Sequence, residues 1–377
     1  MEAIKIFFDN IVYGLQRSGG ISVVWYELLQ RISKTEGLLS PHYIDLPQAD
    51  NYYRQQLQID SSQITSEIKH PKYSRYLPVA VNSSEPFIFH SSYYRYCTNP
   101  RAVNITTVHD FTYELYRSGL QRKIHSWQKF NAIRHSEFIV CVSENTKRDL
   151  LTFLPDVDET RVRVIYNGAS DDYFVINERE TAKTKANLAP KSFVLFIGDR
   201  QGYKHFDLCV NAVSQTDYHL VIVGKDLTPE EKKSINSKIP ESRYHLMGYV
   251  PNSELNILYN HAAALVYPSA YEGFGIPVLE AQKAGCPVIA CNNSSIPEVI
   301  ASQTLLLNSP TEQELVGKLN LLTDEHLMKE VIDQGIRHAQ KFTWDKMVCQ
   351  YIALYQEALN ISKKKNRYEN RHSQQFR

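Results

Sequence analysis

The chain has 377 residues, of which 43% are hydrophobic and 22% charged, with 42 lysines and arginines against 41 aspartates and glutamates. This length fits two domains, and the composition excludes an intrinsically disordered protein, which would be poorer in apolar residues and richer in net charge. A formal net charge of +1 excludes capture of nucleic acid by a generally basic surface, although local basic patches are compatible with it. We therefore expect no nucleic-acid partner.

The first part of the chain alternates apolar runs of strand length with helical patterns. Residues 4–8 form such a run, and a glycine-containing loop and a helical pattern over 23–32 follow. A strand, a glycine loop and a helix form the opening unit of a doubly wound sheet. Further strand-like runs lie at 87–90, 104–109, 138–142 and 162–166, with helical segments at 121–134 and 145–153.

A second series of the same kind follows a polar segment, 171–190, that we interpret as a linker. The alternation indicates parallel strands joined by right-handed crossovers. Its strand-like runs lie at 192–198, 219–224, 244–248, 263–267 and 287–290. We predict two Rossmann-like doubly wound α/β domains, 1–172 and 173–343, facing across a cleft that is the default ligand site. A helix at 344–360 is expected to pack back on the N-terminal domain and to be followed by a basic tail, 361–377.

Several features favour a cytoplasmic protein. The chain enters a strand-like run at once, without the apolar core of a signal peptide, and no stretch approaches the ~18 apolar residues of a membrane span. The six cysteines include no C-x-x-C pair, which favours small buried side chains in a reducing compartment. The tail at 361–377 is interpreted as a solvated end or as a peripheral contact with the inner face of an anionic membrane, and the sequence leaves both open.

The segment 267–285 carries the most chemical information. The tetrapeptide EGFG at 272–275 follows a strand, and Pro277 stands in the first turn of the next helix. Glycines let the backbone approach a ligand closely, and a helix start offers unpaired N–H groups to an anion. Glu272 and Glu280 can therefore accept hydrogen bonds from two parts of one polyhydroxylated ligand. The alternative is an ordinary loop with a surface carboxylate and another that interacts with the helix dipole.

The spacing Glu272-x7-Glu280 within EGFGIPVLEAQKAGCPVIA resembles the signature of retaining, nucleotide-sugar-dependent glycosyltransferases of the GT-B fold, in the group called family 4 or glycosyl transferases group 1. Other segments resemble this family in the expected order and cover most of residues 4–358. The resemblance implies a donor bound mainly by the second domain, with Glu272 on the sugar hydroxyls and Glu280 on the ribose. In overall look the chain is similar to bacterial mannosyltransferase-like enzymes of surface-polysaccharide synthesis.

Arg200 and Lys204 follow the first strand of the second domain. Basic groups at the carboxyl end of a strand suit a diphosphate, although a solvated loop also carries such residues. The resemblance implies that they bind the donor phosphates and stabilise the departing nucleoside diphosphate in place of a metal, so that no cofactor is needed. The Asp156-x-Asp158 motif lies in a polar loop, and we interpret it as chance rather than as a metal site.

The resemblance also implies that the Gly-Tyr-Val segment at 248–250 meets the nucleobase and that His109 lies near the transferred sugar. The alternatives are an ordinary turn and a structural histidine. The implied donor site comprises Gly20, Arg200, Lys204, Gly248, Tyr249, Val250, Glu272, Gly273, Phe274, Gly275, Ile276 and Glu280. The implied catalytic residues are His109, Glu272, Arg200 and Lys204.

Acceptor binding is expected in the first domain, from the glycine loop and from the loops behind two strand ends. The candidate acceptor residues are Gly19, His90, Tyr93, Tyr94 and Asp110. For the loop that begins at His90, a packing role is the alternative.

We predict a metal-independent, retaining glycosyltransferase whose partners are a nucleoside-diphosphate sugar and a glycan or lipid-linked acceptor. GDP-mannose is the first expectation for the donor, and a UDP-sugar is the rival. Two other classes stay open, a nucleotide-sugar epimerase and a binding protein without catalysis. An epimerised nucleotide sugar in the absence of acceptor would identify the first, and donor binding without turnover the second.

Overall fold

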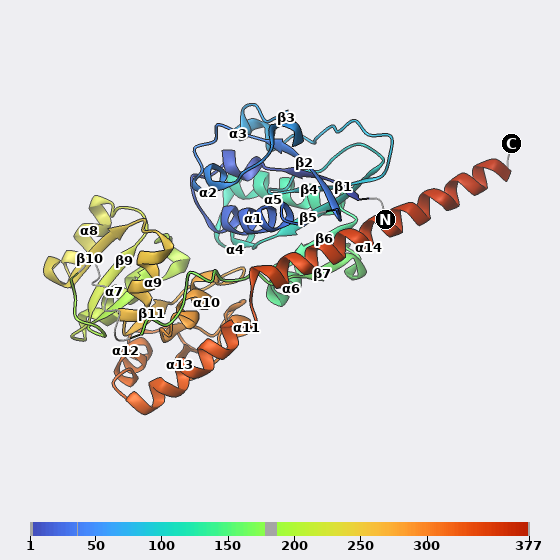
Figure 1. The fold of residues 1–377 in the computed structure, drawn as a ribbon. Coiled ribbons are helices and arrows are strands. Elements are labelled where there is room, and N and C mark those ends of the chain that lie inside the picture. The colour runs from blue at the N-terminus through green and yellow to red at the C-terminus, as the bar shows by residue number, and fades with distance from the viewer. Residues whose placement is uncertain (1–2, 36, 178–186, 376–377) are drawn as a thin grey trace. The chain divides into compact units, whose positions relative to one another are not determined.

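The computed structural model describes residues 3–35, 37–177 and 187–375, with side chains as far as residue 361. The chain divides into two compact units (Figure 1). Unit 1 comprises Met1–Asn167 and Trp344–Arg377, and unit 2 comprises Gly168–Thr343. The change between them falls a few residues before the boundary expected at 172/173. The predicted linker, 171–190, lies partly outside the described residues, at 178–186.

Unit 1 contains a seven-stranded parallel sheet in the order β3-β2-β1-β4-β5-β6-β7. The strands are β1 (Ile4–Asp9), β2 (Leu39–Asp45), β3 (Ile64–Glu67), β4 (Phe87–Ser91), β5 (Ala102–Val108), β6 (Phe138–Cys141) and β7 (Val162–Val164). The helices are α1 (Gly20–Ile32), α2 (Tyr52–Gln56), α3 (Pro71–Ser74), α4 (Thr112–Tyr116), α5 (Gly119–Arg134), α6 (Glu144–Phe153) and α14 (Trp344–Gln375). The central strands β4 and β5 are buried along their whole length, as expected when both faces of a parallel sheet are covered.

Unit 2 contains a six-stranded parallel sheet in the order β10-β9-β8-β11-β12-β13. The strands are β8 (Phe193–Ile197), β9 (His219–Val223), β10 (Tyr244–Gly248), β11 (Ala264–Tyr267), β12 (Val288–Cys291) and β13 (Leu306–Leu307). The helices are α7 (Phe206–Ser214), α8 (Pro229–Asn236), α9 (Asn252–His261), α10 (Ile276–Lys283), α11 (Ile296–Val299), α12 (Glu312–Leu321) and α13 (Glu325–Ala339). The sequence predicted two parallel-sheet α/β domains, and the structure confirms this fold class.

Helix α14 lies along unit 1, where it contacts α1, β1, β4 and β5 (Figure 1). Its buried apolar side chains include Trp344, Met347 and Leu354. The helix continues to Gln375, past the residue at which the apolar pattern of the sequence ends. Residues 361–375, which the sequence analysis expected to belong to a tail, are therefore part of this helix.

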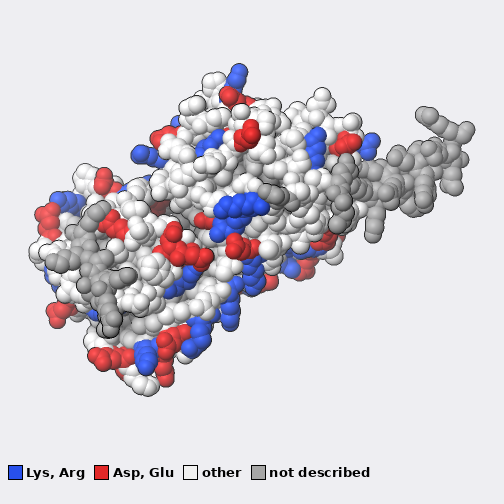
Figure 2. Space-filling model, viewed as in Figure 1, with Lys and Arg blue, Asp and Glu red and all other residues white. Residues whose placement is uncertain are grey.

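Five of the six cysteines, Cys97, Cys141, Cys209, Cys286 and Cys291, are buried and free, as expected. The exception is Cys349 on α14, which is exposed, so the sequence-based expectation was wrong there. Among the described residues, none of the helices combines the length and the apolar character that crossing a bilayer requires. Basic and acidic side chains both occur on the face seen in Figure 2.

Candidate active site

The order of the sheet in unit 2 reverses beside β8, because β9 lies on one side of this strand and β11 on the other. In doubly wound folds a ligand binds outside the carboxyl ends of the strands at such a point. The loop after β8 carries Arg200 and leads into a short 3-10 helix, Gly202–Lys204, and the loop after β11 carries Glu272. Topology thus brings together two segments that are 68 residues apart in sequence.

Lys204 and Glu272 form a part-buried ion pair, in which Lys204 Nζ donates to Glu272 Oε1. Burial alone would lower the pKa of Lys204, but the Glu272 carboxylate and the Tyr267 hydroxyl raise it above its usual value. The lysine is therefore a fixed cation at the carboxyl edge of the sheet. Sequence analysis assigned these two residues to one donor, and the structure places them in direct contact.

The loop from Glu272 to Gly275 is held by two serines that follow β12. The Glu272 N–H donates to Ser294 Oγ across 3.0 Å, and Ser295 Oγ donates to the carbonyls of Glu272 and Phe274, each across 2.8 Å. Gly275, the residue before α10, has φ +110°, a conformation that favours glycine. Among the described residues, no side chain caps the start of α10. Pro277 has no N–H and the Val278 N–H donates to the Gly275 carbonyl at 3.0 Å, so the first turn offers the N–H of Ile276 to a ligand.

Glu280 lies on α10 and accepts a hydrogen bond from the Tyr259 hydroxyl at 3.1 Å. Burial raises the pKa of Glu280 to about 7, although hydrogen bonds from Tyr259 and Tyr173 act in the opposite direction. A carboxyl group of this kind changes its charge near neutral pH and responds strongly to a hydroxyl ligand that donates to it.

Arg200 is held by a different partner from the one that its predicted role suggests. Its Nε and Nη2 donate to the two carboxylate oxygens of Glu231 at 3.0 and 3.1 Å, and Nη2 also donates to the Asp226 carbonyl at 2.8 Å. The side chain is 4% exposed, and among the residues that the structure describes its buried Nη1 has no hydrogen-bond partner. Nη1 is thus a donor that a bound anion could satisfy, because a buried N–H without a partner is costly.

The remaining donor candidates differ in whether they present a side chain or the backbone to a ligand. Gly248 ends β10 with φ +65°, and its carbonyl accepts a hydrogen bond from the Gly224 N–H at 3.0 Å. The Tyr249 side chain is 70% exposed and available for contact. Phe274 instead packs inside unit 2, with its ring centroid 6.1 Å from that of Phe342, so a donor would meet its backbone rather than its ring. Val250, Gly273 and Ile276 are neither fully buried nor fully exposed.

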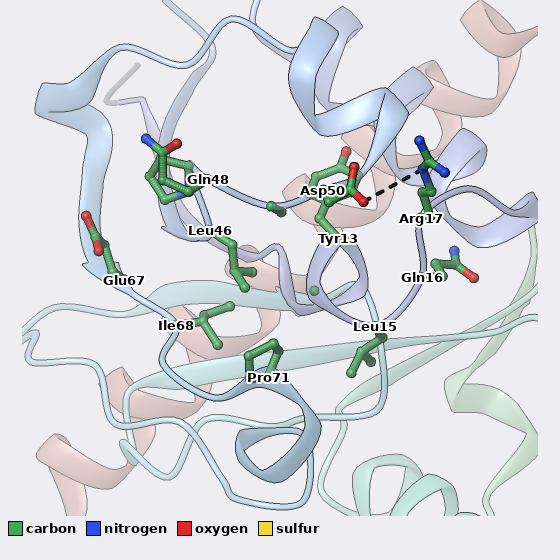
Figure 3. Close-up of a pocket in the computed structure, with 13 residues that line it drawn as sticks. Tyr13, Leu15, Gln16, Arg17, Leu46, Gln48, Asp50, Glu67, Ile68 and Pro71 are labelled. Carbon is green, nitrogen blue, oxygen red and sulfur yellow. Dashed lines mark ion pairs between the residues drawn. The ribbon is translucent and has the colours of Figure 1, made fainter.

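In unit 1 the glycine loop adjoins a pocket of about 470 Å³ (Figure 3). Gly19 precedes α1 and Gly20 is its first residue. Apart from the neighbouring backbone, no atom of the described residues lies within 4 Å of the position that a Cβ on Gly20 would occupy. The pocket has an apolar floor and a polar rim. Floor residues include Leu15, Leu46, Ile68 and Pro71, and rim residues include Gln16, Gln48, Glu67 and the ion pair Arg17–Asp50.

His109 and Asp110 follow β5 and are each partly accessible. Burial lowers the pKa of His109 to about 4; Asp110 raises it and Lys129 lowers it further. The imidazole is therefore neutral near pH 7. Asp110 is fixed at both ends, because its carboxylate accepts from the Thr112 N–H at 2.9 Å and its carbonyl from Lys129 Nζ at 2.8 Å.

Two of the acceptor candidates are buried in unit 1. His90 has no exposed surface, and its ring nitrogens pair with the hydroxyls of Tyr355 and Thr107 at 2.8 and 2.9 Å. Tyr94 is also buried, with Lys129 Nζ 5.5 Å from its ring centroid. Their burial favours the packing role that the sequence left as the alternative. Tyr93 is half-buried and its hydroxyl pairs with His125 Nε2 at 2.9 Å, so the hydroxyl points into the unit.

The Asp156-x-Asp158 motif has other partners. Asp156 pairs with Arg134, and Asp158 accepts from the Thr160 N–H at the start of a 3-10 helix. Across the part of the chain that the structure describes, no three His, Cys, Asp or Glu side chains are grouped so as to hold a metal.

Comparison with known proteins identifies the family. The family profile "Glycosyltransferase Family 4" matches residues 18–173, and the profile "Glycosyl transferases group 1" matches residues 178–338. The chain belongs to the GT-B glycosyltransferases. Its similarity to known members therefore extends over both units.

The glycosyltransferase is 25% identical to the O-antigen chain mannosyltransferase B of Escherichia coli over 291 residues, which are 73% of this chain and 76% of that protein. It is 26% identical to the serotype-specific mannosyltransferase WbdA of the same species, over 57% of this chain and 28% of that longer protein. Sucrose-phosphate synthase from Thermosynechococcus elongatus has the same fold, with a TM-score of 0.72 at 15% identity, over 95% of this chain and 100% of that one.

Sequence analysis of the glycosyltransferase missed the residues that hold the site. They are Tyr173, Glu231, Tyr259, Tyr267, Ser294 and Ser295. Tyr259 looks like a core residue of an amphipathic helix, and Glu231 forms a capping box with Thr228 that explains it without Arg200. The pair of serines before Pro297 gave a turn signal but no indication of its partner.

Proposed function

We propose that the protein transfers mannose from GDP-mannose to a hydroxyl of a glycan or lipid-linked acceptor, with retention of the anomeric configuration. The observation that carries the proposal is the Lys204–Glu272 pair at the carboxyl edge of the unit 2 sheet, beside the uncapped start of α10. The similarity to two mannosyltransferases supports mannose as the sugar.

In the proposed mechanism the donor phosphates take Lys204 as their counterion, and Arg200 contributes its unpartnered Nη1. Glu272 is then released to accept hydrogen bonds from the sugar hydroxyls. The positive groups stabilise the charge that develops as the bond between sugar and phosphate breaks. Since two fixed cations supply this stabilisation, the proposed reaction requires no divalent metal.

Glu280 receives the ribose hydroxyls in this proposal, and the segment 248–250 the nucleobase. The departing phosphate oxygen takes the proton of the acceptor hydroxyl on the same face of the sugar, which leads to retention without an enzymic nucleophile. His109, as a neutral imidazole, offers a hydrogen bond to the transferred sugar without adding charge.

The acceptor is assigned to the pocket beside the glycine loop of unit 1. An apolar floor and a rim with amide, carboxylate and guanidinium groups suit a saccharide, which has both C–H faces and hydroxyl edges. Gly19, in the glycine loop, is assigned to acceptor binding. We infer a cytoplasmic enzyme that works at the inner face of the membrane when its acceptor is lipid-linked.

The test is a donor panel of GDP-, UDP-, dTDP- and ADP-sugars, followed by thermal shift and by turnover with and without a chelator. The proposal predicts stabilisation by GDP-mannose, transfer that survives chelation, and an α-linked product from the α-linked donor by NMR. A UDP-sugar as sole donor would support the rival, an epimerised nucleotide sugar without acceptor would indicate an epimerase, and binding without turnover a scaffold protein.

A further inference from the structure

Lys129 on α5 is a fully buried lysine whose ammonium group joins three elements of unit 1. Its side chain has no exposed surface. Nζ donates to the Asp110 carbonyl in the loop after β5 at 2.8 Å and to Glu114 Oε2 on α4 at 2.7 Å. Lysines are almost never fully buried unless they are paired, because an ammonium ion is costly to remove from water. The cation therefore depends on these two oxygens.

Two aromatic rings enclose the same ammonium group. Lys129 Nζ lies 4.5 Å from the ring centroid of Phe111 and 5.5 Å from that of Tyr94, and both rings are buried. The face of an aromatic ring attracts a cation, and the attraction is larger where water is excluded. Two oxygens and two rings thus hold one positive charge at a fixed place behind the end of β5.

The carboxylate that balances this charge is itself held in place. Ser126 Oγ donates to Glu114 Oε1 at 2.8 Å, and His125 Nδ1 lies 3.8 Å from the same oxygen. Burial alone would raise the pKa of Glu114, but the hydrogen bond to His125, the charge of Lys129 and the hydrogen bond from Ser126 lower it to about 2. Glu114 is therefore ionised at neutral pH, and Lys129 keeps its counterion.

The contact with the Asp110 carbonyl links this buried pair to the candidate site. Asp110 is the residue after His109, and its carboxylate accepts from the Thr112 N–H at 2.9 Å. The backbone that follows His109 is thus fixed by Lys129 from one side and by the turn into α4 from the other. A pair that served stability alone would gain little here, because a buried ion pair is often no more stabilising than apolar side chains of similar volume.

The charged groups that face His109 act in opposite directions. Burial lowers the pKa of His109, Asp110 raises it, and Lys129 lowers it further, to about 4 in all. The other titratable groups beside it are neutral near pH 7, because burial lowers the pKa of His90 on β4 to about 3 and raises that of Tyr94, which hydrogen-bonds to the His109 backbone. Lys129 is therefore the charge that opposes Asp110.

We infer that Lys129 is a positioning residue for the transfer reaction: it holds the backbone that carries His109 and keeps the imidazole neutral. A sugar gains positive character as its bond to phosphate breaks, so a protonated ring beside it would oppose the reaction. The consequence for turnover rests on the proposed function of the protein. The state of His109 does not, because it can be measured without a donor.

The test compares the native protein with Lys129→Met combined with Glu114→Gln. Both charges are removed together, because loss of the lysine alone would leave a buried carboxylate without its counterion. Lys147→Met with Glu159→Gln is the matched control, since it removes an ion pair of unit 1 in which Nζ lies 2.9 Å from Glu159 Oε1. Lys129→Arg keeps the positive charge and shows whether the charge itself matters.

The first measurement is an NMR titration of the full-length protein with isotope-labelled histidine. The chain has 13 histidines, so the signal of His109 is assigned from its loss in His109→Gln. We expect native His109 to titrate near pH 4. The midpoint should lie about one pH unit higher in the Lys129→Met, Glu114→Gln variant, and should stay at its native value in Lys129→Arg and in the control.

The second measurement is turnover with the donor that the panel selects. In the Lys129→Met, Glu114→Gln variant, kcat should fall about tenfold, because the ring is less well placed, whereas GDP affinity and acceptor KM should stay within about twofold. The acid limb of the kcat profile should move to higher pH together with the His109 midpoint. The control should keep the native kcat and the native profile.

Several results would overturn the inference. One is native His109 titrating near 6.5, which needs no variant and therefore decides even where the Lys129→Met, Glu114→Gln variant does not fold. Others are the same midpoint with and without the Lys129 charge, a native kcat in the folded variant, and an equal loss of kcat in the control. A native protein that transfers no sugar would contradict the proposed function, and the titration would then decide the role of Lys129.

Discussion

Tyr259 Oη lies 3.1 Å from Glu280 Oε2 and donates a hydrogen bond to a carboxyl group whose pKa burial has raised to about 7. A ribose hydroxyl that donates to Glu280 needs the carboxylate form. Donor affinity should therefore rise between about pH 6 and about pH 8, with release of a proton on binding. Calorimetry in buffers of different ionisation enthalpy measures that proton. Glu280→Gln should bind more weakly at every pH and show neither the slope nor the proton.

The same group also predicts how stability depends on pH. The folded chain binds this proton more tightly than the unfolded chain, where the pKa is near 4.5, so the free energy of unfolding should fall as pH rises from 4.5 to about 7. Glu280→Gln should remove that part of the decline.

Tyr259→Phe removes a hydrogen bond that lowers the pKa of Glu280, so the midpoint of the pH dependence of donor binding should move to higher pH. An unmoved midpoint would show that another group controls binding.

Lys204→Ala should weaken donor binding about 100-fold, or about 2.7 kcal/mol, because it removes the proposed phosphate counterion and leaves Glu272 part-buried without its partner. Isothermal titration with GDP and GDP-mannose measures the loss. Lys232→Ala is the matched control, since Lys232 pairs with Glu241 at 2.7 Å on the surface and should leave affinity unchanged. Equal affinity of the Lys204→Ala variant and the native protein would contradict the phosphate assignment.

Arg200→Lys should weaken donor binding about tenfold although the charge is kept. A lysine cannot make the two-pronged contact with Glu231 and simultaneously aim a further N–H outward, as the guanidinium does. Since Thr228 and Glu231 keep their capping box, α8 should stay folded. Circular dichroism and donor titration separate these effects. Arg134→Lys, which alters an exposed pair with Asp156, should change neither quantity.

The sequence predicted the alternation of strands and helices because most strands are buried on both faces and read as unbroken apolar runs. It missed β2, β3 and β13. β2 contains Pro41 and His42, β3 is a short edge strand without a buried residue, and β13 has two residues. In each case the apolar signal is too short or too interrupted for a periodicity argument.

The candidate site shows the same division. The sequence predicted the glycine, proline and carboxylate positions around 272–280 because these residues are close together along the chain. The contacts of Lys204 with Glu272 and of Arg200 with Glu231 join residues 68 and 31 positions apart, and depend on which strands lie side by side. His90 and Tyr94 resembled site residues because they lie at or just after the end of a strand, but the direction of a side chain at such a place depends on packing partners such as Tyr355 on α14.

Gly275→Ala should destabilise unit 2 by about 1–3 kcal/mol and reduce donor affinity. Its φ of +110° strains any residue with a Cβ, and that Cβ would lie 3.1 Å from Ile296 Cδ1. Relief of the strain would shift the start of α10. Gly317→Ala is the control, because nothing lies within 4 Å of a Cβ on this helical glycine and the change should stabilise by about 0.5–1 kcal/mol. Thermal unfolding of both variants gives the comparison.

Tyr355→Phe tests the packing role of His90. The variant removes the hydroxyl that pairs with His90 Nδ1, so a buried polar atom loses its partner at a cost of about 1–3 kcal/mol in the free energy of unfolding. Burial, with a smaller contribution from His109, lowers the pKa of His90 from 6.5 to about 3. Between pH 6.5 and pH 3 the His90 side chain therefore binds a proton in the unfolded chain but not in the folded chain. The free energy of unfolding should decline as pH falls from 6.5 towards 3. His90→Gln should make that decline shallower. Acceptor KM in Tyr355→Phe should equal that of the native enzyme, whereas a raised KM at unchanged stability would return His90 to the acceptor site.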